Sequence, residues 1–387
     1  GNNIESAAEQ AASLPCIELV EYNTFAVKAS DGKHYPYQPS ALTKAEDYIF
    51  NDPSLKDQWH YINNKDMSVA LTSRTGADIN VKNAWGLTAG DPRIIVAVCD
   101  EGVKYNHPDL IDNMWVNEDE IPANGIDDDN NGYVDDIHGW NFLSTTDYPK
   151  TISWSEDGDK GHGTHVAGTV AAVNHNGIGV GGVAGGSGKG DGVKIMSCQV
   201  FSGNSSATVA ARAKAYEYAA NNGACILQCS FGLSGGMVTS DGAFDMSYGV
   251  ERAGLDYFFN YRQPYSPVDK NFAIFASGND GYHLAGYPAA HRDYIAVSAI
   301  GPDYLPAFYT NYGPGSNIAA PGGDASINRT AESNRAQVLS TVPSECPEYR
   351  TDYGYMQGTS MACPHVSGVV ALGLSYARKL GKEYSYD

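Results

Sequence analysis

The stretch IIVAVCDEGVKYNHPDL, residues 94–110, contains the pattern that decides the fold. Its first six residues form an unbroken apolar run, which is typical of a strand that is buried on both faces of a parallel sheet. Four similar runs, predominantly apolar, follow it at residues 193–200, 224–230, 271–277 and 294–299. The sequence therefore predicts a sheet of at least five buried strands.

A helix is predicted between the second and third of these runs, at residues 205–223. Val209, Ala213, Tyr216 and Ala220 are three or four residues apart, and Gly223 is a suitable helix terminator. Strands that alternate with helices indicate an α/β fold with a parallel sheet. Ligands of such sheets bind beyond the carboxyl ends of the strands, so Asp100, directly after the first run, is a candidate site residue.

The charge balance narrows the class of partner. The 387 residues include 25 Lys and Arg against 45 Asp and Glu, a net charge of −20. This excess of negative charge disfavours nucleic acid and anionic membrane surfaces as main partners. No apolar run approaches the roughly 18 residues of a membrane span, so no transmembrane segment is expected.

Two further stretches carry reactive groups: GHGTHVAGTVAAV at 161–173 and GTSMACPHVSGVVAL at 358–372. A serine hydroxyl is a poor nucleophile at neutral pH unless a histidine accepts its proton. That histidine in turn needs a carboxylate to fix its tautomer and to stabilise the imidazolium. Asp100, His162 and Ser360 supply the three groups.

Each of these residues also has a simpler interpretation. An aspartate after a strand and a serine before a helix are often only capping residues. His162 and His165, three apart on one helix face, are compatible with a metal pair, but the chain has no His-Glu dipeptide and no Cys-x-x-C to supply further ligands. An α/β-hydrolase would need a histidine well after Ser360, where only His365 remains, five residues on.

The order Asp, His, Ser and five motifs make the chain similar to the subtilisin-like serine proteases, or subtilases, over roughly residues 51–380. The motifs are the Asp100 segment with HPDL at 107–110, GHGTHVAG, ASGNDG at 276–281, IAAPGG at 318–323 and GTSMACPHVSG. The resemblance implies a three-layer α/β fold with a central, mostly parallel sheet flanked by helices. It also implies a serine endopeptidase that forms an acyl-enzyme on protein or peptide substrates.

Residue roles follow from this resemblance. It makes Ser360 the nucleophile, His162 the general base and acid, Asp100 the orienting carboxylate and Asn279 the oxyanion-hole donor. Ser230, Phe231 and Gly232 match the edge segment that pairs with an extended peptide. Gly286 matches the small residue at the floor of the primary specificity pocket, which suggests room for a large side chain there.

The resemblance also divides the chain. We expect residues 1–50 to be an N-terminal extension, either a linker or a remnant of a pro-region that inhibits the enzyme. Residues 51–387 would be the catalytic domain, without the family's usual closing segment after the serine helix. A monomer that is secreted, periplasmic or at the cell surface is implied. A rival hypothesis is a subtilase-like binding or chaperoning protein that is held inactive by its extension or by its missing tail.

An acidic segment predicts a structural calcium site. Residues 105–149 include eleven acidic residues and no Lys or Arg. Asp127, Asp129 and Asn131 with Gly132 fit the first half of an EF-hand-type loop, whereas the twelfth position is His138 instead of Glu. Asp135 or Asp136 would then have to complete the ligand set. The family resemblance adds Asp109 as a ligand of a recurrent calcium site, with Asn176 as a weaker candidate.

Overall fold

The structure is a computed structural model that describes residues 26–29, 35–36, 49–143, 151–156, 158–330 and 333–386. Its centre is a sheet of seven parallel strands in the order β11-β10-β9-β7-β3-β5-β4, to which β6 (Ser205–Ser206) adds an antiparallel edge at β5. The bounds of the seven are β3 Ile95–Glu101, β4 Gly139–Asn141, β5 Lys194–Ser202, β7 Ile226–Cys229, β9 Phe272–Ala276, β10 Ile295–Ile300 and β11 Ile318–Pro321. The five predicted strands are β3, β5, β7, β9 and β10, so the α/β prediction is confirmed.

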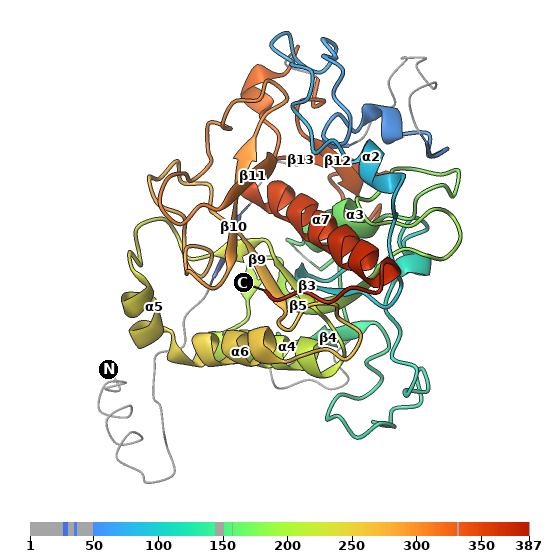
Figure 1. Ribbon diagram of the computed structural model, residues 1–387, viewed down its shortest axis with the longest axis vertical. Helices are drawn as coiled ribbons and strands as arrows, with labels where there is room; N and C mark the ends of the chain where they lie inside the picture. The colour runs from blue at the N-terminus through green and yellow to red at the C-terminus, as the bar shows by residue number, and fades with distance from the viewer. Residues whose placement is uncertain are drawn as a thin grey trace.

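Helices cover both faces of the sheet (Figure 1). On one face lie α3 (His162–Ala171) and α7 (Thr359–Lys379), and on the other lie α4 (Val209–Asn221) and α6 (Gly249–Asn260). Alternate residues of β3 belong to two different cores: Val96 and Val98 pack with α3 and α7, and Ala97 and Cys99 pack with α4 and α6. This two-sided burial explains why the run at 94–99 has no polar residue.

The remaining helices are short. They are α2 (Lys82–Trp85), α5 (Asp241–Ser247) and three 3-10 turns at Leu55–Asp57, Ile111–Asn113 and Ala325–Ile327. Helix α4 begins at Val209, later than predicted, because Thr208 caps it by accepting the Ala211 N–H at 3.3 Å. None of the helices in the described ranges is long and apolar enough to cross a bilayer.

Helix α6 belongs to a segment without a predicted element. It is joined to α4 by a buried ion pair, in which Arg212 donates to both oxygens of Glu251 at 2.8 and 2.7 Å. The Tyr216 hydroxyl also donates to Glu251, at 3.1 Å. The pairing satisfies two charges that would be costly to bury alone.

Two short pieces of the predicted extension pair with strands of the catalytic region. Strand β1 (Val27–Lys28) is antiparallel to β8 (Phe231–Gly232). Strand β2 (Tyr35–Pro36) joins β13 (Tyr353–Met356), which in turn pairs with β12 (Val338–Thr341). Residues 26–29 therefore lie against the strand that the sequence assigns to substrate binding.

Candidate active site

The three predicted catalytic side chains come from three elements that meet at the carboxyl end of β3. Asp100 is the penultimate residue of that strand, His162 is the first residue of α3, and Ser360 lies in the first turn of α7. All three are buried. His162 Nδ1 is 2.6 Å from Asp100 Oδ1, so the carboxylate holds the imidazole with Nδ1 protonated and Nε2 as the acceptor.

Close packing between α3 and β3 fixes this pair. The His162 N–H donates to Glu101 Oε2 at 2.8 Å. A Cβ at Gly163 would lie 2.0 Å from the carbonyl oxygen of Glu101, so only glycine permits this approach. Gly161 has a φ of +69°, a conformation that glycine adopts without strain. The glycines of GHGTH are therefore required by the geometry of the pair.

His165 has a structural role. Its Nε2 is 3.0 Å from the carbonyl oxygen of Val338, and it is fully buried. His162 is engaged by Asp100, so the two histidines do not form a metal pair. His165 is therefore a packed, hydrogen-bonded residue of the core.

Ser360 is held by a reciprocal contact with Ser230. Its Oγ donates to the Ser230 carbonyl oxygen at 2.9 Å, and Ser230 Oγ donates to the Ser360 carbonyl oxygen at 2.7 Å. Among the described residues, His162 Nε2 has no hydrogen-bond partner although it is buried. The histidine is thus available as a base, and the hydroxyl must turn from Ser230 to reach it.

A pair of donors suited to an oxyanion lies beside Ser360. The Ser360 N–H donates to the carbonyl oxygen of Ala29 at 3.0 Å. The Asn279 side-chain oxygen accepts from the Thr359 N–H at 2.9 Å and from its hydroxyl at 2.8 Å. Its Nδ2 is buried and has no partner in the described part of the chain. The Thr359 contacts therefore fix the amide with its N–H groups free to donate.

Residues 26–29 occupy the edge segment as an added strand. Val27 lies opposite Gly232, and Lys28 lies opposite Phe231. The Ala29 N–H donates to the Ser230 carbonyl oxygen at 3.0 Å. The predicted substrate-contacting residues Ser230, Phe231 and Gly232 therefore bind an extended segment of this chain, with its Ala29 carbonyl at the serine.

A small cavity of about 200 Å³ adjoins Ala29. Its walls include Gly232, Leu233, Ala276 and Asn279. Gly286, predicted at its floor, is not among the lining residues; it donates to the Ser277 carbonyl oxygen at 2.8 Å, and a Cβ there would lie 2.7 Å from the Leu233 carbonyl oxygen. Gly286 thus lets two wall segments pack closely, which supports the pocket from behind.

The acidic loop brings together some, not all, of the predicted metal ligands. Carboxylate oxygens of Glu120, Asp127 and Asp129 lie within 4.8 Å of one another. Glu120 was not predicted, because it precedes the EF-hand-like pattern. Asn131 lies next to the cluster and donates to Asp129 Oδ2 at 2.9 Å. Asp135 points elsewhere and accepts from the backbone N–H groups of residues 124 and 125.

Asp109, the other predicted metal ligand, lies outside the acidic loop and near Asp52. One oxygen of Asp109 accepts from Asn176 Nδ2 at 2.7 Å and the other from the Val180 N–H at 2.9 Å. Burial, together with the negative charge of Asp52, raises the pKa of Asp109 to about 7. The pKa of Asp52 is also raised, mainly by burial. Asp52 could not be found from the sequence, since nothing in its local pattern marks it.

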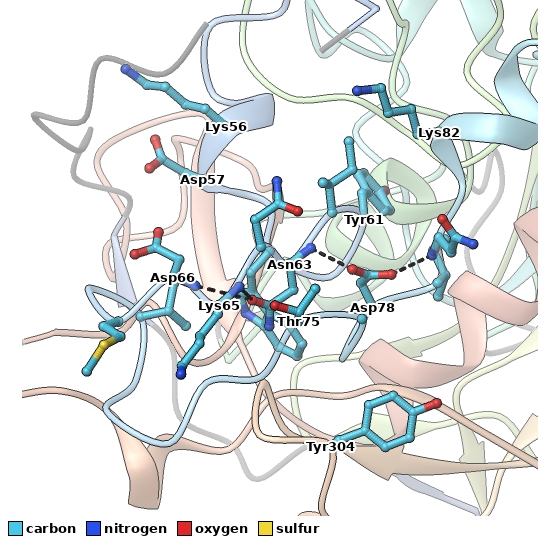
Figure 2. Close-up of a pocket in the computed structure, with 18 of the residues that line it drawn as sticks. Lys56, Asp57, Tyr61, Asn63, Lys65, Asp66, Thr75, Asp78, Lys82 and Tyr304 are labelled. Atoms are coloured by element: carbon cyan, nitrogen blue, oxygen red, sulfur yellow. Dashed lines mark hydrogen bonds between the residues drawn. The ribbon is translucent and has the colours of Figure 1, made fainter. Parts of the chain in front are cut away.

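A second, larger cavity of about 970 Å³ is lined mainly by residues between 56 and 83. Figure 2 shows Asp78 accepting the N–H of Asn63, at 2.6 Å, among lysines and aspartates that line the cavity. Tyr304 closes one side. None of the predicted catalytic or substrate-binding residues lines this cavity.

Comparisons with known proteins agree with this geometry. The Subtilase family model matches residues 91–384. Halolysin of Haloferax mediterranei is 32% identical over 297 residues, which cover 77% of this chain and 44% of that protein. Thermitase of Thermoactinomyces vulgaris is 28% identical over 78% of this chain and 81% of its own length.

A solved structure described as proteases from Pseudoalteromonas arctica PAMC 21717 has a similar fold. It aligns with a TM-score of 0.57 and 26% identity over 84% of this chain and 86% of that one. The chain spans about half the length, or less, of the curated relatives that it first matches.

Proposed function

This chain belongs to the Subtilase family, and we propose that it is a serine endopeptidase that hydrolyses peptide bonds through an acyl-enzyme on Ser360. The observation that carries the proposal is the position of the Ala29 carbonyl. Its oxygen accepts the Ser360 N–H while the Ala29 N–H is bound by Ser230. A peptide carbonyl thus lies beside the backbone N–H of the proposed nucleophile, at the end of a segment bound as an extended substrate would be.

The chemistry assigns one task to each group. Ser360 Oγ adds to the carbonyl carbon while its proton passes to His162 Nε2, and Asp100 stabilises the resulting imidazolium. The oxyanion receives hydrogen bonds from the Ser360 N–H and from Asn279 Nδ2. His162 then protonates the leaving amine, which departs as the C–N bond breaks. Water, deprotonated by the same histidine, cleaves the ester and restores the serine.

An active-site phosphonate tests this proposal. The full chain, incubated with unfolded casein, should cleave it and should be labelled at Ser360. Ser360→Ala should do neither, while Ser230→Ala, which removes only the neighbouring hydroxyl, should still be labelled. A native chain that is neither labelled nor active would favour the binding or chaperoning alternative.

The N-terminal segment supports a second part of the proposal, that the extension inhibits the enzyme until it is cut. Residues 26–29 fill the substrate strand position and place the bond after Ala29 at Ser360. A cut there would begin the new chain at Ser30. This boundary fits an extension that ends before residue 51.

We assign calcium a structural role at two places. Calcium prefers six to eight oxygen ligands, and carboxylates supply them both at Glu120, Asp127 and Asp129 and at Asp52 and Asp109. Asp109 and Asp52 are buried near enough to repel each other, and a bound cation would offset this repulsion and favour the charged carboxylates. Neither place contacts the triad, so calcium would stabilise the fold without taking part in acyl transfer.

An extracytoplasmic location also belongs to the proposal. A relative named extracellular basic protease, from Dichelobacter nodosus, is 28% identical over 86% of this chain. Cell fractionation of the source organism, followed by immunodetection, tests this location. Detection only in the cytoplasmic fraction would contradict it.

A further inference from the structure

The buried carboxylate of Glu101 lies directly after catalytic Asp100 and faces the substrate strand. Its side chain is only 1% exposed. One oxygen, Oε2, accepts the N–H of His162 at 2.8 Å and that of Lys160 at 3.3 Å. The other, Oε1, forms an ion pair with the ammonium group of Lys28. The first oxygen supports the histidine, and the second is available to whatever occupies the place of Lys28.

Lys28 precedes Ala29, so it holds the second position before the bond that lies at Ser360. Its ammonium also donates to the carbonyl oxygen of Gly203 at 3.3 Å, and its side chain is 20% exposed. Lys28 therefore enters a site formed by the end of β3 and the turn that follows β5. Both contacts recognise the charged end of the side chain.

A second acid strengthens the negative character of this site. Asp159 is buried and is tied to the Gly203 N–H. Its pKa is raised to about 6, mainly by burial and in part by Glu101, while Lys28 acts in the opposite direction. Lys160, the cation next along the chain, directs its ammonium to Glu348 instead. Glu101 thus pairs directly with the ammonium of Lys28, and Asp159, held by backbone N–H groups, adds negative charge nearby.

We propose that Glu101 is a specificity-determining residue that selects substrates with a lysine or arginine immediately before the residue whose carbonyl is attacked. This inference rests on the proposed protease function and extends it to the substrate class. An unpaired buried carboxylate is costly, so a substrate that supplies a cation gains binding energy that a neutral one lacks. An acidic side chain there would add a third negative charge.

A peptide series tests the selection. The peptides carry residues 23–34 of this chain between a fluorophore and a quencher, with Lys28 kept or replaced by arginine, norleucine, glutamine or glutamate. Norleucine has nearly the same alkyl stem as lysine without the charge. The full chain is incubated until its cleaving activity is constant, and kcat/KM is then measured for each peptide.

Wild-type protein should cleave the lysine peptide about 30-fold faster than the norleucine peptide, with glutamate slowest. Glu101→Gln should bring this ratio within about threefold, because the charge is lost while the amide can still accept from His162. Asp280→Asn is the matched control. It removes the charge of a carboxylate in the same cleft, which accepts the Gly235 N–H, and it should leave the lysine-to-norleucine ratio unchanged. A ratio cancels any effect that Glu101→Gln has on the chemical step itself.

Two results would overturn the inference: a wild-type ratio near one, or a ratio that Glu101→Gln leaves unchanged. The wild-type series decides even if Glu101→Gln does not fold. Equal cleavage of all peptides with phosphonate labelling of Ser360 would reject the selection and keep the protease. Absence of both cleavage and labelling would reject the protease function, and this inference with it.

Discussion

Two pairs of buried acids in this molecule are neutralised in different ways. At the end of β3, Asp100 pairs with His162 and Glu101 pairs with Lys28, so the chain itself supplies the partners. Beside Asp52, Asp109 receives hydrogen bonds from amide and backbone N–H groups, and its pKa is raised to about 7 by burial and by Asp52. The first pair is complete within the chain, whereas for the second pair our proposal is that a calcium ion from solution offsets the charge. Changes at the first pair should therefore alter catalysis, and changes at the second pair should alter the calcium dependence of stability.

The largest effect is expected from Asp100→Asn. The asparagine would favour the wrong tautomer of His162, so kcat on the lysine peptide should fall by about 10⁴. Asp91→Asn is the control, because Asp91 pairs with Arg93 and Arg378 and contacts none of the triad. The control should retain kcat within about threefold. A loss of less than tenfold for Asp100→Asn would break the assignment of the first pair.

Without calcium, the pair of Asp52 and Asp109 should make the free energy of unfolding fall as the pH rises. In chelator the folded pKa of Asp109, about 7, lies above its ordinary value of 3.8, so the folded state holds the proton more tightly than the unfolded state. The free energy of unfolding should fall as pH rises from about 4 to 7, by about 4 kcal/mol for this group. Denaturant titration in a Ser360→Ala background, which prevents autolysis, measures this change.

Two comparisons isolate the contribution of Asp109. Asp109→Asn should remove the corresponding slope in chelator. With calcium the slope should reverse, because a higher pH favours the ionised carboxylates that bind the ion. Identical pH profiles with and without calcium would show that the second pair is neutralised from within, as the first is.

The sequence predicted best what depends on local pattern. The five buried strands were predicted correctly because each apolar run is contiguous, and the proposed triad residues could be named because the GHGTH and GTSMA motifs are contiguous too. Glu120 was missed because it precedes the EF-hand-like pattern, and Asp52 was missed because it is distant along the chain from Asp109. Strand β1 was missed for the same reason: two residues form it, and its partner lies about 200 residues away. Glu101 adjoins Asp100, but only the position of Lys28 gives it a role.

A buried histidine pair should produce a pH response of the opposite sign to that of Asp109. His365 Nε2 is 2.7 Å from His60 Nδ1, and burial lowers the pKa of His365 to about 4. The unfolded state then binds protons more readily below about pH 6.5, so stability should fall by about 2 kcal/mol between pH 7 and 5. The variant that combines Asp109→Asn with Ser360→Ala, measured in the presence of a calcium chelator, should show this loss of stability. Adding His365→Gln should make the loss smaller. A free energy of unfolding that does not change between pH 7 and 5 would contradict the lowered pKa of His365.

The smallest effect is expected at the partly exposed acidic loop. Asp127→Ala with Asp129→Ala should remove bound calcium and lower Tm by about 2 °C, equivalent to about 1 kcal/mol. Metal analysis and calorimetry with excess calcium measure both quantities. Asp128→Ala is the neighbouring control, since Asp128 is outside the cluster. Unchanged metal content and Tm would restrict calcium to the place beside Asp109.

The most direct test of the account is the mass of the chain before and after incubation. The Ala29 carbonyl lies at Ser360 as a substrate would, so the native chain should release its first 29 residues and begin at Ser30. Ser360→Ala should remain intact, and adding native enzyme to it reports whether one molecule can cut another. Absence of any terminus at Ser30, in a preparation whose Ser360 is labelled by the phosphonate, would contradict the placement of residues 26–29 as a substrate.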